Sequence, residues 1–218
     1  MRLSDRLASL LDREADAAAD LRRYFSEGPD GPLFSGSRFE RLGGGGDRPE
    51  VADTFTADDV VAVSMLSVQI TGHIAIEILE RRNERLGDLL ACIPMDKPLV
   101  DLEPGELGDD WPVRAAYREL VNIDGVGETT ATKLLARKRP QLVPILDSVV
   151  TRELAVVHGQ YWRPLYEWLR ADDRAQHDRL VRIRDAAHIG SDISVLRVFD
   201  VLAWMVGSNY ATSSRRSP

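Results

Sequence analysis

The chain has 218 residues, of which 44% are hydrophobic and 29% are charged. That length and composition suffice to bury a core, and they exclude a chain that is disordered throughout. The net charge of -7 and an isoelectric point of about 5.2 argue against a protein that binds nucleic acid over a broad basic surface.

The first predicted element is a single amphipathic helix over residues 3–25. Apolar residues recur there at helical spacing between charged ones. The segment lacks the apolar core of a secretory signal, and no run of about 18 apolar residues occurs in the chain. We therefore expect a cytoplasmic protein that does not associate with a membrane.

Residues 26–50 are predicted to be a loop or linker. They hold seven of the 16 glycines, together with three prolines, so no long helix or strand can cross them. The run Gly43–Gly46 lacks the Gly-Lys-Ser/Thr ending of a phosphate loop, which favours a flexible connection over a ligand cradle. Phe34 and Phe39 are expected to hold the loop against the core.

The chain is predicted to be mostly helical from Thr56 onward. Residues 56–59 fit a helix start with acidic side chains in the first turn, and the apolar run 60–70 predicts a buried helix, with a strand as the alternative. One or two helices follow over 74–90, and 94–110 is a loop by composition. Further helices are expected at 111–121, 128–138, 147–157, 161–171, 174–187 and 192–206.

These elements predict an all-α protein. Residues 1–50 form an N-terminal helix and linker, 51–208 a helical domain, and 209–218 a disordered tail. The single cysteine, Cys92, excludes a disulfide framework, a cysteine-rich zinc site and a cysteine-held iron–sulfur cluster within one chain.

The most informative segment is Gly125-Val126-Gly127 with its flanking helices. A helix is predicted to end near Val121, and a second helix begins at about Glu128. Glycine permits a tight turn and a close approach from outside, while the second helix presents free N–H groups and the positive end of its dipole. The segment therefore fits a backbone site for a phosphate. The alternative is a tight corner that serves packing alone.

This segment resembles the helix-hairpin-helix DNA-binding motif in its Gly-hydrophobic-Gly form, with Ala131 downstream. The chain from Arg137 to Arg152 resembles the helix-hairpin-helix DNA glycosylase superfamily, which includes endonuclease III. In that family the second hairpin helix leads to a catalytic aspartate, which falls on Asp147 here, and often to an arginine, which falls on Arg152. Asp147 is equally a favoured N-cap for the helix that follows it.

An upstream match supports the glycosylase resemblance. The run from Asp59 to Thr71 is similar to the family's helix ending in Leu-Ser-x-Gln-x-Thr. Gln69 falls on the glutamine that occupies the gap left by a flipped base; the alternative is a buried glutamine that satisfies backbone groups. The blocks FTADDVVAVSMLSV and RKRPQLVPILDSVV also resemble an uncharacterised actinobacterial family, which implies no function.

The resemblance implies double-stranded DNA as a partner. The implied DNA-binding residues are Gln69, Gly125, Val126, Gly127, Thr129, Thr130, Lys133, Arg137, Lys138, Arg139 and Arg152. Main-chain carbonyls of Val121, Ile123 and Val126 are the implied ligands of a monovalent cation. The basic run 137–139 is also typical of a solvated helix end.

The chain departs from the family at several points. Thr129 stands where bifunctional glycosylases carry a Schiff-base lysine, the iron–sulfur cysteines are absent, and the segment between Gln69 and Gly125 is shorter. These departures argue against β-lyase chemistry. They leave a monofunctional glycosylase, in which the Asp147 carboxylate stabilises an oxocarbenium-like transition state and orients a water. A non-catalytic module that binds DNA or a protein is the alternative.

The local charge differs from the overall charge. Residues 111–152 carry seven basic and four acidic side chains, a balance of +3, so the rest of the chain carries -10. The acidic total therefore does not exclude DNA contact, and it predicts a small, salt-sensitive footprint.

Overall fold

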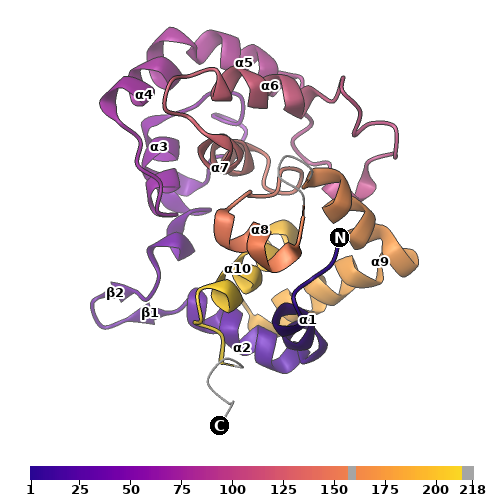
Figure 1. The fold of residues 1–218 in the computed structure, drawn as a ribbon. Coiled ribbons are helices and arrows are strands. Elements are labelled where there is room, and N and C mark those ends of the chain that lie inside the picture. The colour runs from indigo at the N-terminus through magenta and orange to yellow at the C-terminus, as the bar shows by residue number, and fades with distance from the viewer. Residues whose placement is uncertain (157–160, 213–218) are drawn as a thin grey trace. The chain divides into compact units, whose positions relative to one another are not determined.

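The computed structural model describes residues 1–156 and 161–212 and shows an all-α protein with one short two-stranded ribbon (Figure 1). The chain forms two compact units. Unit 1 comprises Met1–Phe34 and Leu146–Pro218, and unit 2 comprises Ser35–Ile145. This division differs from the expected boundary at residue 50, because the N-terminal helices pack with the C-terminal ones while the glycine-rich segment belongs to unit 2 from Ser35 onward.

Unit 1 begins with two helices where one was expected. Helix α1 (Asp5–Asp12) and helix α2 (Glu14–Tyr24) are separated at Arg13, whose ψ of 70° is not helical. The Ser4 hydroxyl accepts a hydrogen bond from the Leu7 N–H and caps α1. The period of apolar residues continues across Arg13, so the pattern alone does not reveal the break.

The C-terminal helices form the rest of unit 1. Helix α8 (Ser148–Leu154) packs on α10 (Val195–Gly207), while α2 packs on both α10 and α9 (Trp162–Ala187). Most of α10 is buried, as its strongly apolar sequence predicts. Residue 157, where the helix from 147 was expected to end, lies outside the described residues.

Helix α9 is bent in its middle, which confirms the two helical segments expected there. Ala171 has an extended ψ of 147°, and the next three residues, Asp172, Asp173 and Arg174, have φ values of 50°, 55° and 67°. Three consecutive non-glycine residues in the left-handed region end the first segment and redirect the second.

The last described residues are ordered, although a disordered tail was expected from 209. The Tyr210 ring stacks on the Trp204 ring with centroids 5.4 Å apart, and the Thr212 N–H donates to the buried Asp20 carboxylate over 3.1 Å. Residues 213–218 of the predicted tail lie outside the described part of the chain.

The predicted loop over 26–50 contains no long element. Strands β1 (Glu27–Gly28) and β2 (Gly31–Pro32) pair in antiparallel fashion, and 3-10 turns follow at Ser35–Arg38 and Leu42–Gly44. Phe39 is 2% exposed, as expected. Phe34 stacks on Tyr24 with ring centroids 5.1 Å apart.

Unit 2 continues with α3 (Ala57–Ser64), which begins where the helix start was expected and has a capping box between Thr56 and Asp59. The helix is shorter than predicted: residues 65–71 are irregular, and Val61 in α3 is 49% exposed. Helix α4 (Gly72–Ile76) runs into a π-helical turn (Glu77–Arg81), and α5 (Asn83–Ala91) follows.

The hairpin helices complete unit 2. The expected loop at 94–110 contains one 3-10 turn, Leu99–Asp101. Helix α6 (Pro112–Val121) packs on α5 and on α7 (Glu128–Lys138), and α7 also packs on α3. Helix α7 is therefore covered from two sides by its own unit.

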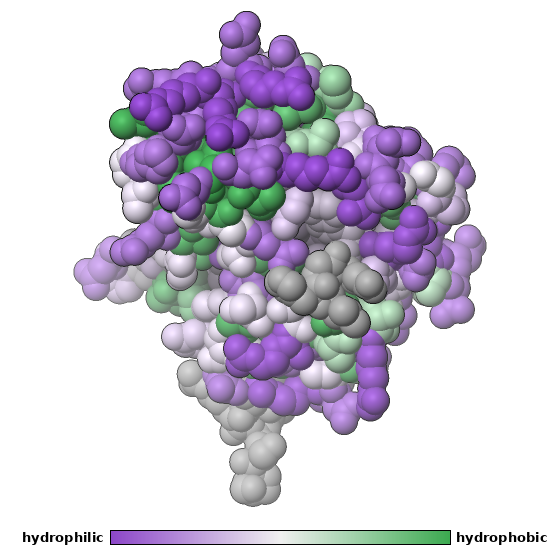
Figure 2. All heavy atoms as spheres, turned by 45° about the horizontal axis from the view of Figure 1, so that its top comes forward, coloured by the Kyte–Doolittle hydropathy of each residue, from purple (hydrophilic) through white to green (hydrophobic). Residues whose placement is uncertain are grey.

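Hydrophilic side chains cover most of the face in Figure 2, with apolar residues gathered in smaller areas. Among the residues that the structure describes, no helix combines the length and the apolar character needed to cross a membrane.

Candidate nucleic-acid interface

The hairpin turn in unit 2 has the predicted boundaries. Helix α6 ends at Val121 and α7 begins at Glu128. Gly125 has a φ of 85°, a left-handed conformation that other residues adopt at a cost, and the Val126 N–H donates to the Ile123 carbonyl over 2.9 Å. The turn itself therefore requires glycine at position 125.

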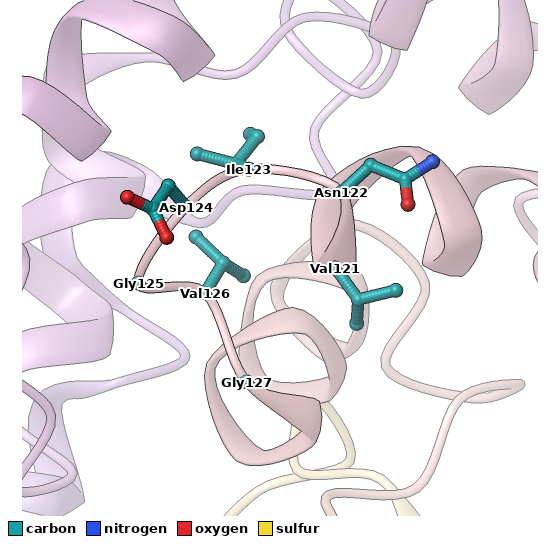
Figure 3. A pocket seen from close by; sticks show the side chains of 7 residues that line it. All are labelled: Val121, Asn122, Ile123, Asp124, Gly125, Val126 and Gly127. Atoms are coloured by element: carbon teal, nitrogen blue, oxygen red, sulfur yellow. The ribbon is translucent and has the colours of Figure 1, made fainter.

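The middle residue of the turn anchors it. Figure 3 shows the Val126 side chain inside the turn and the Asp124 side chain directed away from it. Val126 is 6% exposed, whereas Gly125 and Gly127 on either side of it are exposed. Packing of one apolar side chain thus leaves the glycine backbone at the surface.

Gly127 is glycine for a different reason from Gly125. Its φ of -90° suits any residue, and apart from the two adjacent residues no neighbour lies within 4 Å of the place that a Cβ would occupy. The fold therefore does not require glycine at this N-cap of α7. A missing side chain keeps the first N–H groups of α7 accessible from outside, where helix N-termini bind anions.

Acidic groups surround this helix start. Glu128 lies in the first turn of α7, and Asp124 is exposed in the turn before it. Burial and the Glu128 carboxylate together raise the pKa of the Tyr117 hydroxyl above its ordinary value. These carboxylates complement the dipole of α7 and oppose the approach of a second anion.

A hollow of about 490 Å³ lies against the hairpin (Figure 3). It is lined by the consecutive residues 121–127. Val121, Ile123 and Val126 are all part of this lining, so their carbonyls remain candidate ligands for a monovalent cation. The Ile123 carbonyl already accepts one hydrogen bond from the Val126 N–H, which leaves a second lone pair.

The side chains of α7 are less accessible than the resemblance implies. Thr129 is partly exposed, Thr130 is 9% exposed and Lys133 is 3% exposed. The Lys133 ammonium donates to the Leu66 carbonyl over 2.8 Å, within unit 2. The predicted phosphate contact by Lys133 is therefore wrong. The main chain at the start of α7 remains the candidate phosphate contact.

The basic run at the other end of α7 is buried, so the predictions of a phosphate contact and of a solvated helix end are both wrong. Arg137, Lys138 and Arg139 are 2%, 0% and 0% exposed. The Arg137 guanidinium donates to the Phe39 and Glu40 carbonyls, both over 2.5 Å. These three side chains hold the glycine-rich loop of unit 2 instead of a ligand.

Asp59 is the buried acidic partner of this basic run, and the sequence did not predict that pairing. It is fully buried, and its carboxylate lies 3.1 Å from the Arg137 Nε and 2.5 Å from the Lys138 Nζ. Loss of hydration on burial lowers the pKa of the Lys138 ammonium, and the Asp59 carboxylate opposes that shift. The capping-box position of Asp59 was a visible signal, but its partners lie 78 and 79 residues away along the chain.

Gln69 lies in the irregular segment between α3 and α4, not at the end of a helix, and its side chain is exposed. Its alternative reading as a buried glutamine is therefore wrong. The predicted helical context of the Leu-Ser-x-Gln-x-Thr match is also wrong, because α3 ends at Ser64 and Ser67 has a φ of 61°.

Asp147 and Arg152 belong to unit 1. Asp147 is the N-cap of α8, where its Oδ1 accepts a hydrogen bond from the Val149 N–H over 2.8 Å, and it is partly exposed. Arg152 is exposed on the same helix. The capping role is thus present in a residue that is only partly buried. Within the described ranges, no three His, Cys, Asp or Glu side chains gather as metal ligands.

Fold and site together define an all-helical protein with a helix-turn-helix corner whose glycine backbone is exposed. The chain belongs to a family of unknown function, DUF6308, whose model matches residues 17–207. Comparisons with curated proteins and with solved structures give no match. The family match covers both units and all helices from most of α2 to the end of α10.

Proposed function

We propose that this protein binds duplex DNA through the main chain of the hairpin. The main-chain N–H groups of the exposed Gly125 and Gly127 and those in the first turn of α7 would donate to a backbone phosphate, in the manner of the helix-hairpin-helix motif that the segment resembles. The observation that carries the proposal is Gly127, an exposed glycine that neither its backbone angles nor its neighbours require.

Burial of the basic run reduces the number of cationic side chains that can contact DNA. Of the seven basic side chains in residues 111–152, the four buried ones are Lys133, Arg137, Lys138 and Arg139. Three basic residues then remain against four acidic ones. The interaction proposed here depends on hydrogen bonds from the backbone and a helix dipole, so it is weak and independent of DNA sequence.

The test is the substitution Gly127→Ala, because a Cβ has free space there and the fold should be unchanged. We expect it to weaken binding of a labelled duplex at low salt about tenfold, measured by fluorescence anisotropy, by blocking the approach of the phosphate. Gly72→Ala is the matched control, since Gly72 is an exposed glycine of unit 2 with equally open space. Absence of wild-type binding at low salt, or equal effects of both substitutions, would contradict the proposal.

Base excision is a separate, enzymatic proposal, which rests on unit 1 by itself. The observation behind it is Asp147, a residue that stays partly exposed although it caps α8. The carboxylate would stabilise the oxocarbenium-like transition state while a water attacks the sugar carbon and the base departs. Asp147→Asn separates the roles, because asparagine caps helices as well as aspartate.

We expect alkali-labile abasic sites to form in duplexes carrying uracil, alkylated or oxidised bases, and Asp147→Asn to abolish them without loss of stability. Equal activity of the variant, or no abasic product across the panel, would contradict the enzymatic proposal.

The acidic surface favours a second candidate, a module that binds a basic protein. A co-purifying basic partner together with undetectable DNA binding would favour it.

A further inference from the structure

The Lys138 ammonium lies in a cage made by unit 2. Its Nζ donates to the Gly46 carbonyl over 3.1 Å and to the Val51 carbonyl over 3.0 Å, and it lies 2.5 Å from the Asp59 carboxylate. The Phe55 ring covers it, with the centroid 5.6 Å from Nζ. The side chain is 0% exposed.

These groups are the ones that recognise a small monovalent cation. Two carbonyl oxygens and a carboxylate oxygen match the three N–H donors of a primary ammonium, and an aromatic face adds a cation–π attraction. An apolar side chain of the same length would remove one donor from each of these acceptors, although Asp59 would keep Arg137 and the Val51 carbonyl would keep the Thr54 N–H. The loss of a donor at a buried acceptor is costly.

The loop over residues 39–53 is shaped around this cation. Gly43, Gly44 and Gly45 have φ values of 59°, 84° and 99°, which side chains rarely permit. A Cβ on Gly46 would stand 2.6 Å from the Asp59 Oδ1 and 2.7 Å from the Arg137 Cγ. The four-glycine run thus places main-chain carbonyls close to α7, which differs from the flexible connection expected of it.

The neighbours of Lys138 hold the two ends of the loop. Arg137 donates to the carbonyls of Phe39 and Glu40 at its start. Arg139 donates to the Ala52 carbonyl over 2.8 Å and pairs with Asp53 at its end. The ammonium contacts the loop between these two ends, at the Gly46 and Val51 carbonyls, so its removal leaves the contacts of Arg137 and Arg139 in place.

We propose that the loop over residues 39–53, together with Asp59, forms a binding site for a primary ammonium group. The Lys138 side chain is its built-in ligand and holds the middle of the loop against the end of α7. This inference concerns unit 2 alone and does not depend on DNA binding.

The experiment replaces the tethered ligand by a free one. Lys138→Ala removes three methylene groups and the amino group, which together correspond to n-propylammonium. In neutral buffer we expect amide exchange in residues 39–53 to become about tenfold faster in the variant. Added n-propylammonium chloride should restore slow exchange and raise the thermal midpoint of the variant more than that of the wild type.

The controls separate charge from volume. n-Propanol fills the same space without a charge, and tetramethylammonium carries a charge but has no N–H donor. Lys138→Met keeps most of the apolar stem, so it should lose protection of the loop and resist rescue. Lys97→Ala removes a partly exposed lysine of the same unit, which pairs with Glu106, and should change neither measurement. Equal rescue by n-propanol, or no rescue by n-propylammonium, would overturn the proposal.

A variant that does not fold in plain buffer still gives an answer. Refolding of Lys138→Ala from urea is then compared in n-propylammonium and in n-propanol at equal concentration. A greater yield of folded protein in n-propylammonium supports the site. Equal yields, or no folded protein in either, count against it.

Discussion

Gly46 and Gly127 show two opposite reasons for a glycine. At Gly127 there is open space and ordinary backbone geometry, so the absence of a side chain serves something outside the chain. At Gly46 the surrounding atoms of Asp59 and Arg137 leave no room for a Cβ. The sequence alone does not distinguish the two cases, because it shows only the residue type and not the neighbours.

We expect Gly46→Ala to lower the free energy of unfolding by about 1–3 kcal/mol, because buried Asp59 and Arg137 must shift to admit the methyl group. Gly105→Ala, at an exposed position with nothing within 4 Å, should change it by less than about 0.5 kcal/mol. Urea unfolding of both variants measures the difference. Equal stability of the two would show that the loop accommodates a side chain at 46.

Tyr161 makes stability depend on alkaline pH. It is 3% exposed, and burial, followed by the Asp200 carboxylate, raises the pKa of its hydroxyl well above the ordinary value of 10.0. Above that ordinary value the unfolded chain loses the proton while the folded chain keeps it. Stability contributed by this group is therefore complete below about pH 10 and falls as the pH rises further, by up to about 1.4 kcal/mol per pH unit.

Tyr161→Phe removes the proton that is lost on unfolding. We expect the free energy of unfolding of the wild type minus that of the variant to be constant at neutral pH. This value should decrease as the pH rises above about 10. Chemical denaturation across that pH range measures it. A difference that stays constant to the highest accessible pH would show that the hydroxyl ionises equally in both states.

At the scale of elements, several helix boundaries were predicted correctly from local sequence signals. Gly125 and Gly127 predicted the end of α6 and the start of α7, and the bend in α9 falls between the two helices expected at 161–171 and 174–187. The break at Arg13 was not predictable, because no glycine or proline marks it. The early end of α3 at Ser64 was also missed, since the apolar run continues beyond it.

Burial of the basic run could not be inferred from its own residues. Cations at the last turn of a helix are usually solvated. Here the Arg137 side chain donates to carbonyls that lie 97 and 98 residues earlier in the chain. Such pairings depend on how a distant loop folds, and the local pattern of charges does not predict that conformation. The hairpin turn of the candidate site therefore has its predicted backbone, whereas most of the basic side chains predicted to contact DNA are buried.

The bend in α9 predicts a stabilising substitution. Asp173 is exposed and has a φ of 55°, which costs an L-residue roughly 1 kcal/mol relative to glycine. Asp173→Gly should therefore raise the free energy of unfolding by up to about 1 kcal/mol. Ala175→Gly, two residues later on an exposed helical position, should lower it by about the same amount. Losses of similar size in both variants would show that Asp173 is helical in solution.

At the scale of the whole molecule, formal charge and available charge differ. The sequence assigns a balance of +3 to residues 111–152, but four of the seven basic side chains there are buried and the balance of the rest is -1. Long-range attraction of DNA toward this segment is correspondingly small.

This balance predicts a shallow salt dependence of the proposed DNA binding. Each neutralised phosphate contributes a slope of about -0.9 to the logarithm of the association constant against the logarithm of salt concentration. We expect a total slope no steeper than about -3, since few cationic side chains are available. Anisotropy titrations at several salt concentrations measure it. A slope near -6 would require a basic surface elsewhere on the protein.

Burial of the basic run also determines which amines of the folded protein can be modified. The chain has three lysines, of which Lys133 and Lys138 are buried, while the Lys97 side chain is 34% exposed. An acylating reagent should therefore label Lys97 alone among the lysines of the native protein and reach the other two after unfolding. Mass spectrometry would then measure the fraction of chains labelled at Lys138. That fraction reports how often the contact between the end of α7 and the loop over residues 39–53 is broken.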